Sequence, residues 1–227
     1  MIKTNLAVLM AERGLKIADV YEATGISKTT LMAISENTGK GIQYETIDKL
    51  CNFFNVSPEK FFVYSPYIFK FHDLKHTDSF DTISITVERA NNLTSYELSM
   101  TIKTPQAYNY PVSKDDADFM LFVAPAVEED PTKWGENEKA FYKIYDNLPT
   151  VLKSDLNNRL YKMILDNLSR LNGITLKALD GDVLSGKDLV HEVTVKNGMN
   201  VIINVFGGRF TRITKVPLFV VKNRKQK

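Results

Sequence analysis

The segment Thr24-Gly25-Ile26-Ser27-Lys28-Thr29-Thr30-Leu31 decides how the N-terminal part of this chain folds. A tight turn between two helices requires a left-handed φ angle, which Gly25 tolerates because glycine has no Cβ. Ile26 supplies the apolar side chain that fills the angle between the helices. Ser27 is placed to cap the following helix through its hydroxyl group. The segment therefore predicts a helix before Gly25, a turn, and a second helix over residues 27–36.

Apolar residues on both sides of this segment return at helical spacing through about residue 65. The stripes comprise Leu6, Leu9 and Met10; Val20; Leu31 and Ile34; and Ile47, Leu50, Cys51 and Phe54. The first stripe ends at Arg13-Gly14, since a glycine commonly follows a helix. Ser57-Pro58 starts a short fifth helix, because proline is tolerated in a first turn. Residues 1–65 are thus predicted to form an all-α domain of five helices, with Cys51 in its core.

The side of the 27–36 helix that does not carry Leu31 and Ile34 is small and polar, the pattern of a helix-turn-helix unit that reads DNA. Together with residues 47–56 and 57–62, the span 15–62 resembles the Cro/C1-type (Xre family) helix-turn-helix domain, a lambda-repressor-like fold. The resemblance implies a compact domain that binds operator DNA as a dimer, with helix 27–36 in the major groove.

The resemblance also implies which residues contact DNA. Candidates for base or nearby phosphate contact are Ser27, Lys28, Thr29, Met32 and Ala33, and Thr30 belongs to the same helix surface. Lys16, Lys28 and Lys40, with the helix N-terminus at Ser27, are the candidates for phosphate contact.

Two positions depart from the pattern of the family. Ile17 stands where many members have a glutamine that touches a phosphate, and Tyr21 stands where most have an alanine that lets the two helices approach closely. The first departure removes one contact with the DNA backbone. The second is expected to alter the crossing angle of the helices.

The charges of residues 1–65 balance, with seven basic and seven acidic side chains. DNA affinity must then come from local placement of about four phosphate contacts per subunit, and a dimer doubles the counterion release that dominates affinity. One isolated copy of this domain is expected to bind DNA weakly.

After Ser65-Pro66 the apolar period changes to two. Ile83, Ile85 and Val87 predict a half-buried strand, which Asn91-Asn92 turns back into residues 96–103. Helices are predicted at residues 137–147 and 154–171. Residues 67–227 are therefore predicted to form an α+β domain with antiparallel hairpins, which makes the chain α+β overall.

The last part of the chain contains the strongest turn signal. Asn197-Gly198 separates two apolar runs, 193–195 and 201–203, and predicts a hairpin with a type I′ turn, in which both central residues have positive φ. Gly207-Gly208 is expected to turn the chain again into residues 210–214. Residues 218–221 are predicted to form a last, more buried strand.

Two charge blocks underlie the net charge of +2. Residues 196–227 contain eight basic and no acidic side chains, whereas residues 115–138 contain eight acidic side chains against Lys133. Blocks of opposite charge can pair two subunits or two domains, and a basic chain end can bind the phosphates of DNA. Alternatively, each block is simply a charged surface in contact with solvent. Arg209, Arg212 and Lys215 share these alternatives. Trp134, in a polar loop, either anchors a partner or covers the adjacent helix.

Length and composition exclude several classes of protein. The 227 residues, 44% hydrophobic and 25% charged, fit a soluble globular protein of two modest domains rather than a disordered or fibrous chain. The chain has no apolar run of membrane-spanning length and no secretory signal, so a cytoplasmic protein with no membrane partner is expected. One cysteine and three histidines leave no disulfide framework and little for a zinc site, so neither metal nor cofactor is expected.

Three further motifs fail as catalytic sites. Ser99-Met100 superficially matches the serine of self-cleaving phage regulators but lacks the preceding Gly-Asp, and the chain contains no Ala-Gly scission site. His191-Glu192 lies in an alternating strand pattern rather than a zinc-protease helix. Asp73-Leu74-Lys75 has the shape of a nuclease element without the upstream carboxylate. The chain is therefore not expected to be an enzyme.

The leading hypothesis is a sequence-specific transcriptional regulator, a repressor of a bacterium or its phage, that binds double-stranded DNA as a homodimer through helix 27–36. Residues 67–227 would dimerise, bind a protein or small-molecule effector, or do both. The alternative is a protein-interaction module, such as an antirepressor or host-factor inhibitor, that uses a repurposed helix-turn-helix fold.

Overall fold

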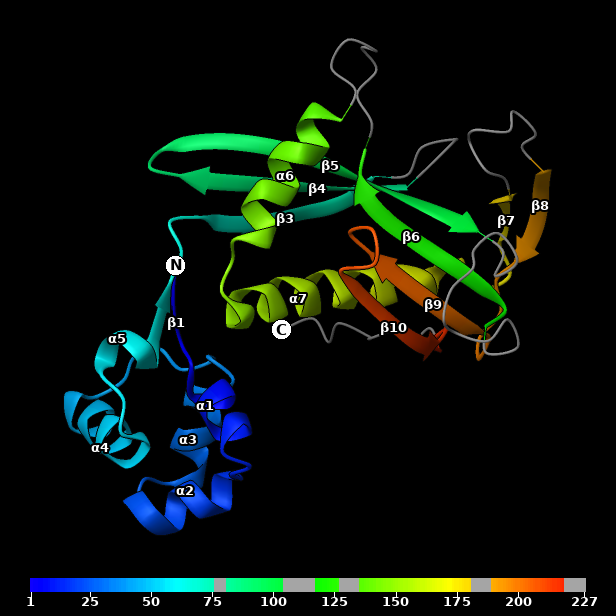
Figure 1. The fold of residues 1–227 in the computed structure, drawn as a ribbon. Helices are drawn as coiled ribbons and strands as arrows, with labels where there is room; N and C mark the ends of the chain where they lie inside the picture. The colour runs from blue at the N-terminus through cyan, green and yellow to red at the C-terminus, as the bar shows by residue number, and fades with distance from the viewer. Residues whose placement is uncertain (76–80, 104–116, 127–134, 181–188, 219–227) are drawn as a thin grey trace, which may run out of the picture. The chain divides into compact units, whose positions relative to one another are not determined.

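The structure is a computed structural model that describes residues 1–75, 81–103, 117–126, 135–180 and 189–218. It divides into two compact units, Met1–Ile68 with Tyr145–Leu156, and Phe69–Ile144 with Asn157–Lys227. Short helices dominate the first unit, and a six-stranded sheet dominates the second (Figure 1). This mixture of helix and sheet confirms the predicted α+β class.

The N-terminal part of the first unit consists of short helices between two short strands. Its elements are β1 (Ile2–Thr4), α1 (Leu6–Glu12), α2 (Ile17–Thr24), α3 (Lys28–Ser35), α4 (Tyr44–Phe54), α5 (Pro58–Phe61) and β2 (Phe62–Tyr64). β1 pairs antiparallel with β2, so that Ile2 lies opposite Tyr64. The prediction of an all-helical segment was wrong about this pair, because strands of three residues are too short to show a period in the sequence.

One apolar cluster holds the first unit together. It comprises Leu6, Leu9, Met10, Val20, Ile26, Leu31, Ile34, Leu50, Cys51, Phe54 and Phe61. The predicted core positions of this segment are therefore confirmed, except that Ile47 is only partly buried against the cluster. Burial raises the pKa of the Cys51 thiol, and the charge of Asp48 adds to the shift. Cys51 is accordingly a core residue whose thiol stays protonated at neutral pH.

Asn37 ties the end of α3 to the outer edge of β1. Its side-chain oxygen accepts a hydrogen bond from the Thr4 backbone N–H at 2.6 Å, and its side-chain nitrogen donates to the Thr4 carbonyl at 3.2 Å. The buried Thr4 hydroxyl donates to the carbonyl of Ile34 at 2.6 Å. The Asn37 amide thus pairs with the backbone of β1 as a neighbouring strand would, and the Thr4 hydroxyl binds the last turn of α3.

Replacing Asn37 with glycine is expected to destabilise the first unit by about 1–2 kcal/mol, because two backbone groups of Thr4 lose their partner. Glycine suits the positive φ of this position (56°), so backbone strain does not enter the comparison. Asn55→Gly is the matched control, since Asn55 also has a positive φ (49°) and its exposed side chain makes no hydrogen bond in the described part of the chain. Denaturant unfolding should separate the two variants, and equal stability would refute the role of the amide.

The second unit is built on a six-stranded sheet. Its strands are β3 (Ile68–Lys75), β4 (Asp81–Arg89), β5 (Asn92–Lys103), β6 (Phe119–Pro125), β9 (Asn200–Val205) and β10 (Phe210–Lys215). They lie in the order β10-β9-β6-β5-β4-β3. β6 and β9 run parallel, whereas β9 and β10, β4 and β5, and β5 and β6 pair antiparallel. A separate ribbon joins β7 (Thr175–Asp180) to β8 (Leu189–Thr194).

Two of the predicted turns join adjacent strands. The β4–β5 hairpin turns at Ala90 and Asn91, both with positive φ (47° and 67°), one residue earlier than predicted. Gly207-Gly208 lies in the loop between β9 and β10, as predicted. The predicted strand at 218–221 lies outside the described residues, apart from Leu218, which is exposed and not in a strand.

The predicted hairpin around Asn197-Gly198 was wrong. β8 pairs with β7, whereas β9 pairs with β6 and β10, so the two flanking runs belong to different sheets. The turn itself exists, since Met199 N–H donates to the Lys196 carbonyl at 3.2 Å. Only Gly198 has a positive φ (85°), which fits a type II turn rather than type I′. The apolar runs specified strands, but not their partners.

Two longer helices follow in the sequence, α6 (Glu136–Asp146) and α7 (Thr150–Leu168), and α7 continues as a 3-10 turn, Ser169–Leu171. The end of α6 and the start of α7, within Tyr145–Leu156, belong to the first unit, and the rest of both helices belongs to the second. Both helices were predicted. Leu160, Ile164 and Leu168 are fully buried along one side of α7. Phe141 of α6 packs edge-on against Tyr96 of β5, with ring centroids 5.3 Å apart. No described helix combines the length and hydropathy that crossing a bilayer demands.

Both edge strands of the sheet contact the same turn of α7. Arg159 donates to the carbonyl of Phe69 in β3 at 3.3 Å, and Arg212 of β10 donates to Asn158 at 3.1 Å. Since β3 and β10 are the two ends of the strand order, the sheet must curve around α7. α7 therefore contributes to the core of the second unit, and its side chains contact both edge strands of the sheet.

Candidate nucleic-acid interface

The turn between α2 and α3 has the geometry that its sequence predicts. Gly25 has a φ of 70°, and its N–H donates to the carbonyl of Tyr21 at 2.9 Å, which closes α2. The Thr24 hydroxyl donates to the carbonyl of Val20 and accepts from the N–H of Ile26. Ile26 is buried in the core cluster. The turn thus fixes α3 against α2 through one left-handed residue and one apolar plug.

Replacing Gly25 with alanine is expected to cost about 1–2 kcal/mol of stability, the penalty of a Cβ in a left-handed conformation. No atom lies within 4 Å of the added Cβ, so the effect isolates the backbone cost. Gly41→Ala is the control, because its Cβ also meets open space and its φ is not in the left-handed region. Thermal unfolding should show a lower midpoint for Gly25→Ala alone. A similar loss in both variants would mean that φ at Gly25 is unimportant.

Ser27 caps α3 as predicted. Its side-chain oxygen accepts a hydrogen bond from the N–H of Thr30 at 3.2 Å, and the hydroxyls of Ser27 and Thr30 are 2.9 Å apart. Leu31 and Ile34 point into the core. The Thr30 hydroxyl is therefore engaged by Ser27. The Thr29 hydroxyl is exposed and makes no hydrogen bond in the described structure.

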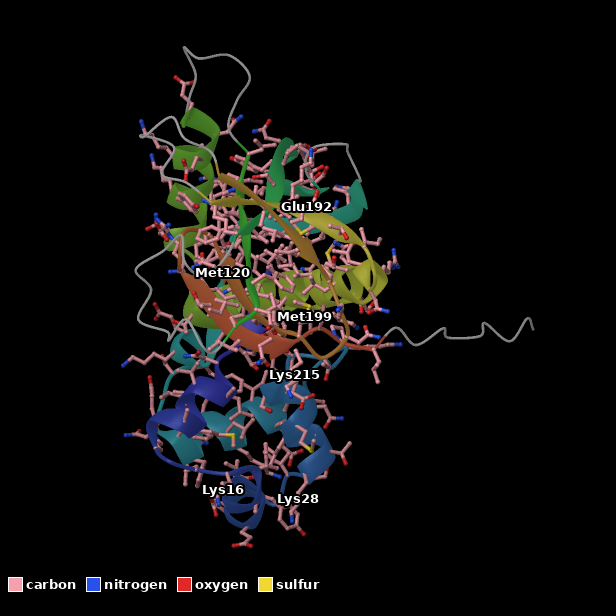
Figure 2. The ribbon with its side chains drawn as sticks, turned by 90° about the vertical axis from the view of Figure 1, so that its right-hand side faces the viewer. Lys16, Lys28, Met120, Glu192, Met199 and Lys215 are labelled. Atoms are coloured by element: carbon pink, nitrogen blue, oxygen red, sulfur yellow. The ribbon has the colours of Figure 1, made fainter. Side chains whose placement is uncertain are left out.

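The outward side of α3 is open to solvent. Exposed residues among the predicted contacts are Lys16, Ser27, Lys28, Thr29, Thr30, Met32 and Lys40, while Ala33 is partly buried. Met32 is 49% exposed, which is unusual for a large apolar side chain in a helix that packs on a core. Lys16, at the start of α2, and Lys28, the first residue of α3, lie toward the same end of the helical unit (Figure 2).

Two hollows flank α3. One, of about 640 Å³, is lined by Thr29, Thr30, Ala33 and Lys40 together with residues of β1, β2 and the loop before α4. The other, of about 430 Å³, lies between the turn at Gly25 and the start of α4, where Ser27 and Thr30 meet Gln43, Thr46 and Lys49. The structure thus brings most of the predicted contacts together around α3. Lys16, Lys28 and Met32 line neither hollow.

Comparison with known families identifies this part of the chain. Residues 5–66 match the family model of the Cro/C1-type helix-turn-helix DNA-binding domain. The N-terminal segment is a Cro/C1-type domain. Searches of curated proteins and of solved structures give no match. The match confirms the resemblance seen in the sequence, and it covers the part of the chain in which α3 lies.

The residues of the Cro/C1-type domain that the sequence reasoning missed lie at the start of α4. Gln43 and Thr46 line the hollow beside Ser27, and α4 begins at Tyr44, before the first apolar residue of its stripe. A helix start without a Ser, Thr, Asp or Asn cap gives no strong sequence signal. Lys49 also lines this hollow, and its ammonium is 2.7 Å from the Glu45 carboxylate, which it holds at a lowered pKa.

The two departures from the family pattern have different surroundings in the Cro/C1-type domain. Ile17 is partly buried against the core cluster, so it contributes to packing. Tyr21 is 42% exposed and packs its ring beside Lys28, whose Nζ atom is 5.2 Å from the ring centroid. The larger side chain at position 21 therefore projects toward solvent beside the start of α3.

Other candidate residues outside the Cro/C1-type domain have partners in the second unit. The Arg209 guanidinium lies 3.8 Å from the ring centroid of Tyr142, and that of Arg212 lies 4.8 Å from the ring of Tyr161. Lys215 is exposed at the end of β10. Ser99 is half-buried in β5, with its hydroxyl donating to the carbonyl of Ala124 at 3.4 Å. Trp134 lies outside the described residues, as do the side chains of 73–75 and 191.

Proposed function

We propose that the chain is a sequence-specific transcriptional regulator, a repressor in a bacterium or its phage, that reads an operator through the exposed side of α3. The observation that carries this proposal is the solvent-exposed row of Lys28, Thr29 and Met32 on a capped helix of a Cro/C1-type domain. Lysine and threonine supply hydrogen-bond donors and acceptors to base edges, and apolar side chains contact thymine methyl groups.

The placement of charge supports this proposal. Although residues 1–65 are neutral overall, the lysines of the α3 surroundings, Lys16, Lys28 and Lys40, are exposed and make no ion pair in the part of the chain that the structure describes. The first turn of α3 adds the partial positive charge of a helix N-terminus. These groups favour phosphates on both sides of the groove that α3 would enter.

We further propose that the chain acts as a homodimer and that the second unit joins two copies or responds to an effector. A neutral domain with few phosphate contacts binds weakly, and linking two such domains raises the effective concentration of the second half-site contact. The role proposed for the second unit is one of binding rather than catalysis.

The experiment that tests the proposal is selection of bound duplexes from a randomised 30-base-pair library with the purified full chain. We expect enrichment of one motif with two similar half-sites about one helical turn apart, because a two-fold dimer places two α3 helices in successive major grooves. If the helix-turn-helix fold serves only a protein partner, no motif should be enriched, and binding should show only the weak, salt-sensitive affinity common to basic surfaces.

A further inference from the structure

The ring of Tyr21 lies beside the ammonium group of Lys28, across the turn that joins α2 to α3. The Nζ atom is 5.2 Å from the ring centroid, within the range of about 6 Å at which the electron-rich face of a ring attracts a cation. Tyr21 is 42% exposed, so its ring does not serve the core cluster. A large side chain with no core function thus contacts one of the residues proposed to bind DNA.

The position of Lys28 makes this contact relevant to binding. Lys28 is the first residue of α3, next to the exposed Thr29, and its ammonium makes no ion pair in the described structure. A free lysine side chain loses rotamer freedom when it is fixed. A ring that restricts the ammonium before DNA arrives removes part of that loss from the binding step.

We infer that Tyr21 is a positioning residue that holds Lys28 in place for its contact with DNA. The inference rests on the proposed function and adds to it a residue that the family pattern would not assign, since most members have alanine there. Tyr21 acts through its ring face, so a phenylalanine should serve as well. The opposite effect, in which the ring competes with DNA for the ammonium, would make Tyr21 inhibitory.

A double-mutant cycle tests the inference with the full chain and the best duplex from the random selection, at one fixed salt concentration. Tyr21→Leu should weaken binding about two- to fivefold, because part of the rotamer freedom of Lys28 would then be lost in the binding step. In a Lys28→Met background the same change should have less than a twofold effect, because the cation is gone. Tyr21→Phe, the matched control, should bind like the natural chain.

A second measurement needs no DNA. The Cε protons of Lys28 should show an upfield ring-current shift in the NMR spectrum of the free protein, and Tyr21→Leu should abolish it while the amide spectrum of α1 stays unchanged. Absence of that shift in the natural chain would overturn the inference.

The remaining outcomes distinguish the two proposals. Equal losses for Tyr21→Leu in both backgrounds would show that Tyr21 acts through the fold, and tighter binding would show that the ring holds Lys28 away from DNA; either overturns the inference alone. An unchanged affinity for Lys28→Met, or the absence of any selected duplex, would overturn the proposed function and the inference together.

Discussion

Replacing Lys28 and Thr29 together with alanine is expected to weaken binding to the selected duplex by about 30- to 1,000-fold. Each side chain that contacts a base edge or an adjacent phosphate well contributes about 1–2 kcal/mol, and the two losses are expected to add to about 2–4 kcal/mol. Neither side chain makes a hydrogen bond in the described structure, and both are exposed, so the fold should be unaffected. Fluorescence anisotropy with a labelled duplex measures the effect.

Lys60→Ala is the control for this double substitution. Lys60 is an exposed lysine of α5 rather than of α3 and is not among the predicted DNA contacts, so its removal changes the net charge by the same amount without altering the surface of α3. It should weaken binding by no more than about twofold, mainly through long-range electrostatics. If the double variant and Lys60→Ala bind equally well, α3 is not the surface that reads DNA.

Replacing Phe54 with alanine is expected to destabilise the first unit by about 3–5 kcal/mol, since a fully buried aromatic side chain leaves a cavity. Phe54 is 1% exposed and lies under the Arg13 guanidinium, which is 5.1 Å from its ring centroid and also donates to its carbonyl oxygen at 2.8 Å. The free energy of opening, from hydrogen exchange of peptides that cover α1, α3 and α4, measures the loss.

The neighbouring Phe53 provides a matched control, because it has the same side chain on the same helix but is 36% exposed. Phe53→Ala should cost about 1 kcal/mol or less. If both substitutions cost the same, the assignment of Phe54 to the core and Phe53 to the surface is wrong. A large loss for Phe54→Ala should also abolish DNA binding at temperatures where the variant is unfolded.

The sequence predicted the Cro/C1-type domain well because its signals are local. Gly25, Ile26 and Ser27 each act within a few residues, through a backbone angle, a buried side chain and a helix cap. The helix periods that specify the core also depend on spacings of three and four residues. Such features can be recognised in the sequence without knowing which helix or strand packs against them.

The sequence predicted the second unit less completely because its strands pair over long distances. The apolar runs on both sides of Asn197-Gly198 form strands as expected, yet β9 pairs with β6, some 80 residues away, rather than with β8. A turn signal reports a reversal of the chain but not which sheet each strand joins. The sequence did not predict β1 and β2 for a related reason, because these short strands pair residues 2–4 with residues 62–64.

The candidate site was predicted as far as α3 itself. The exposure of Lys28, Thr29 and Met32 follows from the helical period, because Leu31 and Ile34 fix which side is buried. The contributions of Gln43, Thr46 and Asn37 depend on where α4 and β1 meet α3, and no local pattern gives that. The contact between Tyr21 and Lys28 likewise required the crossing of α2 and α3 to be known.

The most direct test of the central claim, that the exposed side of α3 contacts DNA, is a methyl NMR titration of the full chain with the selected duplex. With 13C-methyl methionine labelling, the signal of Met32 should shift and saturate with the duplex, since Met32 is 49% exposed on that side. The signals of Met10 and Met100, buried at 8% and 5% exposure, should stay in place. Saturable binding that leaves the Met32 signal unmoved would contradict the account.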